Sequence, residues 1–150
     1  MILFSLLLYF ALDYHNNLNT VYTMWLQSGG LCIAHAVHNG LTSQPQCAEY
    51  THGEKVAFGL LTQLVCEGRP QEEIQAILKF CRSSVGLPIT LAAVGVDAKD
   101  DKAVMEIAER ATAPGETSHN GPVDVTAKVV AHAIRAADRC GSLFEQGKAT

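Results

Sequence analysis

The chain has 150 residues, of which 48% are hydrophobic and 17% charged, and its formal net charge is −4. A chain of this length buries roughly two thirds of its unfolded surface, enough for one core, so we expect one domain. The sequence has a negative net charge and no cluster of basic residues, which excludes a nucleic-acid partner. Charged residues are sparse for a free-standing domain, so part of the apolar surface is expected to face another domain.

Residues 1–12 (MILFSLLLYFAL) form an apolar run, followed by a polar, turn-prone linker at residues 13–19. The run is shorter than the ~20 residues that span a bilayer, no Lys or Arg precedes it, and no small-residue cleavage pattern follows it. A signal peptide or membrane anchor is therefore the minor alternative. The five cysteines have irregular spacings and no C-x-x-C motif, which favours buried reduced thiols and a cytoplasmic protein.

Two predicted helices carry the histidines of greatest interest. Residues 30–41 are apolar nearly all the way round, the pattern of a helix buried in a core, and this helix contains His35 and, three residues later, His38. Thr51 and Glu54 form a capping-box pattern, so His52 is expected at the first position of the next helix, residues 52–67. The positive end of that helix disfavours imidazolium and leaves a nitrogen lone pair for a metal.

The spacing of these histidines does not decide between two interpretations. His35 and His52 are 17 residues apart, which matches no compact zinc motif. From the residues alone, the structural interpretation is favoured over a metal site, with His35 as a core histidine bonded to a backbone carbonyl and His52 as a helix-start residue. His38 shares a helix face with His35 and remains a third candidate ligand.

The rest of the chain is predicted to be helical. Pro70 suits the first position of a helix whose apolar face recurs to Cys81, and Gly86 and Pro88 stop that helix. Residues 89–96 would be an isolated strand, so we expect a short helix or an extended connector there. Two further helices are expected, one opened by Asp100 or Asp101 and ended by Pro114 and Gly115, and one running from Asp124 or Thr126 to Cys140. The first should bury Val104, Ile107, Ala108 and Ala111, and the second Val129, Val130, Ala133, Ile134 and Ala137.

Two further histidines are assigned no chemistry. His119 is expected to be solvated or to stabilise a loop, and His132 to pack at a boundary of the last helix.

The segments GGLCIAHAVHNGLT (29–42) and THGEKVAFGLLTQLV (51–65) resemble the metal-binding part of bacterial glycerol dehydrogenases. These enzymes are the zinc-dependent branch of the iron-containing alcohol dehydrogenase family. The later segments VGLPITL, ATAPGETSHN and VVAHAIRAADRCG are similar to the same family in the same order, so the resemblance covers roughly residues 28–141. It implies an all-α, multi-helix bundle like the C-terminal domain of these enzymes and of dehydroquinate synthase-like enzymes.

The resemblance also implies a site and an activity. The family holds its zinc with one aspartate from the N-terminal half and two histidines, which correspond here to His35 and His52, with His38 as a near neighbour; iron is the other metal of the family. NAD receives the hydride and the substrate is a small polyol such as glycerol. Residues 28–150 would then be the helical metal-binding domain and residues 1–27 an unrelated leader and linker.

The segment before residue 28 shows no resemblance to the family, and the chain has no G-x-G-x-x-G motif. We therefore expect the NAD-binding domain to be absent and the chain alone to be inactive. Two alternatives stay open, a non-catalytic helical interaction module and a half-enzyme complemented by a separate NAD-binding chain. A homo-oligomer is also compatible with the sequence.

Overall fold

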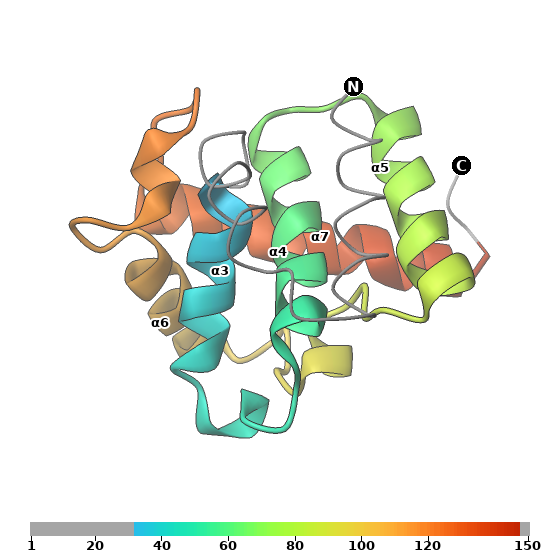
Figure 1. Ribbon diagram of the computed structural model, residues 1–150, viewed down its shortest axis with the longest axis horizontal. Coiled ribbons are helices and arrows are strands. Elements are labelled where there is room, and N and C mark those ends of the chain that lie inside the picture. Colours follow the sequence, from blue (N-terminus) through green and yellow to red (C-terminus); the bar gives the residue numbers. More distant parts are fainter. Residues whose placement is uncertain (1–31, 148–150) are drawn as a thin grey trace, which may run out of the picture. The chain divides into compact units, whose positions relative to one another are not determined.

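The computed structural model describes residues 32–147, and the predicted leader, linker and domain boundary at residues 27 and 28 lie outside this part. Within it every regular element is helical and no strand occurs, which confirms the all-α prediction (Figure 1). The α-helices are α3 (Cys32–Thr42), α4 (His52–Cys66), α5 (Gln71–Lys79), α6 (Asp101–Ala111) and α7 (Ala127–Glu145). The shorter turns are η1 (Pro45–Cys47), η2 (Phe80–Val85), η3 (Ala92–Val94) and η4 (Thr117–Asn120).

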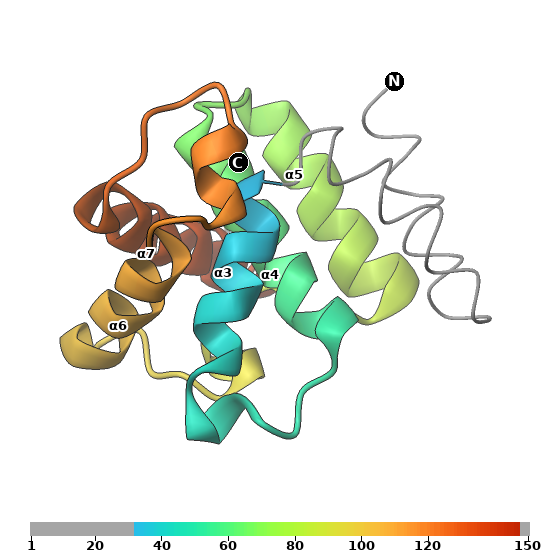
Figure 2. The same ribbon diagram turned by 60° about the vertical axis from the view of Figure 1, so that its left-hand side comes forward.

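Helices α3 and α4 form the centre of this bundle. Both views show α3 between α4 on one side and α6 with η4 on the other, and α7 contacts α4 and α6 (Figures 1 and 2). The largest fully buried side chain is Phe58 of α4, and Ile33, Val37 and Leu41 of α3 are also buried. The two histidine-bearing helices therefore pack against each other at the centre of the bundle.

Local capping signals set the helix starts. Asp100 caps α6 by accepting a hydrogen bond from the backbone N–H of Ala103 (3.0 Å), and Thr126 caps α7 by accepting one from that of Val129 (3.3 Å). Both belong to the predicted pairs of starting residues. α6 ends at Ala111, before the predicted Pro114, whereas α7 continues five residues beyond Cys140 to Glu145.

Three local predictions need correction. Pro70 is the N-cap of α5 and not its first helical residue, with φ −55° and ψ 144°. The helix does not run to Gly86 with one geometry, because Phe80–Val85 forms a π-helical turn that ends where Gly86 takes a positive φ of 76°. Val129 is 41% exposed, because it lies in the first turn of α7, just before the buried stripe that starts at Val130.

The connector at residues 89–96 contains the short helix η3, one of the two forms expected for it. Its apolar side chains Ile89, Leu91, Val94 and Val96 are buried. The backbone N–H of Leu91 donates to Asp138 Oδ1 of α7 (2.8 Å), so the connector is tied to the last helix.

The five cysteines are free thiols, with Cys32, Cys47 and Cys81 buried and Cys66 and Cys140 half-buried. None of the helices that the structure describes is long and apolar enough to cross a membrane.

Candidate metal site

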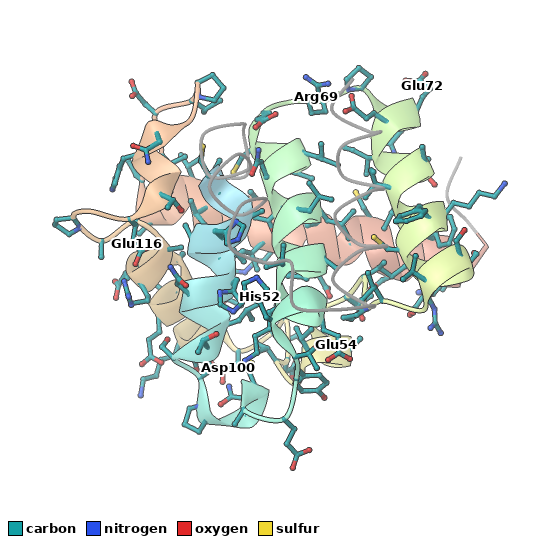
Figure 3. The ribbon with its side chains drawn as sticks, in the orientation of Figure 1. His52, Glu54, Arg69, Glu72, Asp100 and Glu116 are labelled. Atoms are coloured by element: carbon teal, nitrogen blue, oxygen red, sulfur yellow. The ribbon has the colours of Figure 1, made fainter. Side chains whose placement is uncertain are left out.

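The histidines of α3 and α4 lie together at one end of the α3–α4 pair. His35 and His38 are one turn apart on α3, and His52 is the first residue of α4. The ring centroids of His35 and His52 are 5.6 Å apart, and those of His38 and His52 are 4.3 Å apart. Figure 3 shows His52 at the start of α4, on the side of that helix that faces α3.

The capping box places His52. The Thr51 hydroxyl accepts a hydrogen bond from the backbone N–H of Glu54 (3.4 Å), and the Glu54 carboxylate accepts one from the backbone N–H of Thr51 (2.7 Å). These reciprocal bonds satisfy two backbone donors that a helix start otherwise leaves without partners. The predicted capping box is confirmed, and it fixes His52 as the first helical residue.

A glycine brings the two helices close enough for their histidines to meet. A Cβ atom on Gly59 of α4 would lie 2.3 Å from the backbone oxygen of Ala34, the residue that precedes His35. Real Cβ atoms essentially never approach another heavy atom so closely. The backbone of α4 therefore touches that of α3 at this point, and only glycine permits it.

His35 differs from its predicted environment. We expected a buried imidazole, but the residue is half-buried and His52 is exposed. The reason is that the pair lies where α4 begins, at the edge of the α3–α4 interface and not in its middle.

His38 is tightly engaged by neighbouring polar groups. Its Nε2 lies 3.1 Å from Nδ1 of His52 and 3.3 Å from the Thr42 hydroxyl, and its Nδ1 lies 3.1 Å from Oδ1 of Asn39. Burial, followed by the electrostatic effect of His52, lowers the pKa of His38 to about 4. His38 is therefore neutral at pH 7.

The spacing of the His35 and His52 rings fits a shared zinc ion. Two imidazoles bound to one tetrahedral zinc, each at a Zn–N distance of about 2.0–2.1 Å, place their ring centroids about 5 Å apart. The distance between His35 and His52 is 5.6 Å, whereas His38 and His52, at 4.3 Å and nearly edge to face, are closer than such a pair. Among residues 32–147 no group of three or more His, Cys, Asp or Glu side chains could hold a metal ion.

Relatives of known name share this region. The chain is 47% identical over 117 residues to the glycerol dehydrogenase of Thermotoga maritima. The aligned region covers 78% of this chain and 32% of the relative. It is 50% identical over 115 residues to the glycerol dehydrogenase of Citrobacter freundii, covering 77% of this chain and 31% of the relative. This chain is homologous to the C-terminal part of glycerol dehydrogenases.

The solved structures agree with the sequence comparison. Glycerol dehydrogenase from Schizosaccharomyces pombe superposes with a TM-score of 0.71 at 32% identity, over 77% of this chain and 30% of that structure. No protein-family model matches the sequence. The chain spans about a third of the length of the relatives it matches. The predicted resemblance to glycerol dehydrogenases is thus confirmed for their C-terminal part.

The two remaining histidines of the described region lie away from this cluster. His119 is exposed on η4 and its Nε2 donates to the backbone oxygen of Thr112 (3.0 Å), the turn-stabilising role expected for it. His132 is exposed and does not pack at a boundary as predicted, because the buried stripe of α7 follows Val130, Ala133 and Ile134 and leaves His132 outside it.

Sequence reasoning missed the polar residues that surround His38. Asn39 donates through Nδ2 to Glu116 Oε2 (2.9 Å), and Arg110 forms an ion pair with Oε1 of the same carboxylate. Asn39 and Glu116 are 77 residues apart in the sequence. No local pattern could have paired them, since only the packing of η4 against α3 brings them together.

Proposed function

We propose that this chain is the C-terminal portion of an NAD-dependent glycerol or polyol dehydrogenase, in which His35 and His52 are two ligands of the catalytic metal. The observation that carries the proposal is the convergence of these two imidazoles from separate helices in a chain 47–50% identical to glycerol dehydrogenases. Zinc is the preferred metal of the proposal, since imidazole nitrogens suit it and the ring spacing fits its tetrahedral geometry.

In this proposal the residues of the chain hold and orient the metal. His35 offers a nitrogen from the first turn of α3, and His52 offers one from the start of α4, where the helix dipole disfavours the protonated ring. Zinc held by His35 and His52 would supply Lewis-acid stabilisation of a substrate hydroxyl, and NAD would be the hydride acceptor. The remaining ligand and the NAD-binding groups are proposed to belong to the part of the enzyme that corresponds to the other two thirds of the relatives.

Zinc titration of the purified chain tests the ligand assignment. We expect weak zinc binding, because the remaining ligand is proposed to lie outside this chain, and complete loss of that binding in His35→Ala and in His52→Ala. His132→Ala is the matched control, because His132 is an exposed histidine on α7 and should leave the titration unchanged. Binding that survives His35→Ala but disappears in His38→Ala would contradict the assignment and make His38 the ligand.

A second experiment separates a half-enzyme from a non-catalytic module. The chain is mixed with a fragment that comprises the N-terminal two thirds of the Citrobacter freundii relative, and NADH formation from glycerol is followed. Activity in the mixture that neither part has alone, and that His52→Ala removes, supports the proposed dehydrogenase role. A mixture in which the two parts associate and bind zinc without any turnover would favour the non-catalytic module.

A further inference from the structure

A continuous series of polar side chains leads from His52 across α3 to the far side of that helix. Its members are His52, His38, Asn39 and Glu116, and we call it the His52–Glu116 chain. The successive polar atoms are 3.1, 3.1 and 2.9 Å apart. Glu116 closes the series with its ion pair to Arg110. Figure 3 shows His52 and Glu116 on opposite sides of α3.

The carboxylate end fixes the direction of the first bond. A carboxylate paired with arginine only accepts hydrogen bonds, so the group of Asn39 that faces Glu116 must be its NH₂. The amide oxygen of Asn39 then points the other way, toward Nδ1 of His38. An amide oxygen also only accepts, so the hydrogen of this second bond belongs to Nδ1 of His38.

The same reasoning continues to His52. At pH 7.5, above the ordinary histidine pKa of about 6.5, the imidazole of His38 is neutral and carries one hydrogen, so with Nδ1 protonated its Nε2 holds a lone pair. This Nε2 is 3.1 Å from Nδ1 of His52, and the hydrogen between them must therefore be that of His52. His52 is then protonated at Nδ1, and its own lone pair is on Nε2. The Thr42 hydroxyl, 3.3 Å from Nε2 of His38, can donate or accept and so does not fix the direction by itself.

We propose that Glu116, acting through Asn39 and His38, fixes His52 as the Nδ1–H tautomer so that Nε2 is the nitrogen offered to the metal. The inference rests on the proposed role of His52 as a ligand. Glu116 and Asn39 are positioning residues, since neither touches the metal. The side chain of Glu116 is only 9% exposed, so water competes poorly for its bonds. Such bonds to a metal-bound histidine select its tautomer and orientation.

An isosteric substitution makes the proposal sharp. In Glu116→Gln the Arg110 guanidinium keeps the amide oxygen, because Arg110 only donates, so the new NH₂ group faces Asn39. The amide of Asn39 must then turn its oxygen toward Gln and its NH₂ toward Nδ1 of His38. Each later hydrogen reverses in turn, and both histidines become Nε2–H tautomers. Replacing one carboxylate oxygen of Glu116, the residue before η4, by an NH₂ group is thus expected to invert the tautomer of His52 at the start of α4.

The tautomers are measured in the metal-free chain labelled with ¹⁵N-histidine, by long-range ¹H–¹⁵N correlation at pH 7.5. We expect Nδ1–H signals for His38 and His52 in the wild type and Nε2–H signals for both in Glu116→Gln. Glu109→Gln is the matched control, because Glu109 is an exposed acid on α6 and its loss removes the same charge. It should leave both tautomers unchanged. An Nε2–H tautomer of His52 in the wild type would overturn the proposal, and so would identical tautomers in the wild type and Glu116→Gln.

Zinc titration of the same proteins separates this inference from the proposed function. We expect Glu116→Gln to bind zinc about 10-fold or more weakly than the wild type, the usual effect of losing such a partner. Wild-type tautomers as expected, together with no zinc binding even in the presence of the Citrobacter freundii fragment, would refute the metal site and leave the His52–Glu116 chain intact. Zinc binding that needs His52 but is unaffected by Glu116→Gln would refute the inference and leave the metal site intact.

Discussion

The close contact between α3 and α4 at Gly59 makes a prediction that does not depend on any metal. Gly59→Ala places a methyl group 2.3 Å from the backbone oxygen of Ala34. That atom belongs to the main chain of a helix and cannot swing aside as a flexible side chain would. To reach the 3.4 Å at which van der Waals contact becomes ordinary, α4 must move back by about 1.1 Å.

Two opposing effects set the magnitude. Alanine in place of glycine in a helix interior favours the helix by about 1 kcal/mol. Forcing an extra methyl group into a packed interface costs about 1–3 kcal/mol or more, and a gap of about 1 Å also forfeits a quarter to a half of the dispersion energy of the atoms that separate. Because the clash is with backbone, the upper part of that range applies. We expect a net loss of about 2 kcal/mol in the free energy of unfolding.

Urea unfolding followed by circular dichroism measures this loss. Gly121→Ala is the matched control, because a Cβ there would lie 3.6 Å from the nearest atom and Gly121 has a φ of −84°, which alanine adopts freely. The control should be unchanged or stabilised by about 0.4–1 kcal/mol, through a less flexible unfolded chain. If Gly59→Ala is as stable as the wild type, the close approach of α4 to α3 is refuted.

Three further predictions concern single contacts and pH. Thr51→Ala should lower the free energy of unfolding by about 1 kcal/mol, because the backbone N–H of Glu54 loses its acceptor, whereas Thr51→Ser should retain most of that stability in the same urea assay. Asp138→Ala should lower the free energy of unfolding by about 1–3 kcal/mol, because the backbone N–H of buried Leu91 loses its acceptor. Asp138→Asn keeps an oxygen there and should lower it less. Equal losses of the two variants in thermal unfolding would contradict this reason. Burial raises the pKa of the Cys81 thiol from 9.0 to about 12. The stability that the protonated thiol contributes is therefore present below pH 9 and is lost as pH rises from 9 toward 12. Urea midpoints that stay constant over this range in the wild type, or that fall equally in Cys81→Ala, would contradict this assignment.

The starts of the helices could be predicted from the sequence because they depend on residues that are neighbours along the chain. Thr51 and Glu54 satisfy each other's backbone groups within one turn, and Asp100 and Thr126 each cap a backbone N–H three residues ahead. The apolar spacing of Val104, Ile107 and Ala111 likewise identified the buried face of α6. Such interactions form within a single segment, whatever that segment packs against.

Burial at the edges of the bundle was decided by the tertiary structure. Val129 and Val130 are the same residue type in adjacent positions, yet only Val130 is buried, because successive helix residues point about 100° apart and the packed face of α7 carries Val130. His35 is half-buried because α4 begins beside it. A helix's own pattern shows which face is apolar but not how far along that face its neighbour extends.

The surroundings of the candidate metal site depend even more on the tertiary structure. The sequence singled out His35 and His52, through a capping box and a family resemblance, but gave no reason to connect His38 or Asn39 with Glu116. The bond between Asn39 and Glu116 joins residues 77 positions apart, and it forms only because η4 packs against α3. The residue types and the local conformation around each histidine were thus determined by the sequence. Which polar groups meet, and therefore which nitrogen of His52 carries the proton, was decided by the packing of distant segments, because hydrogen bonds require contact within about 3 Å.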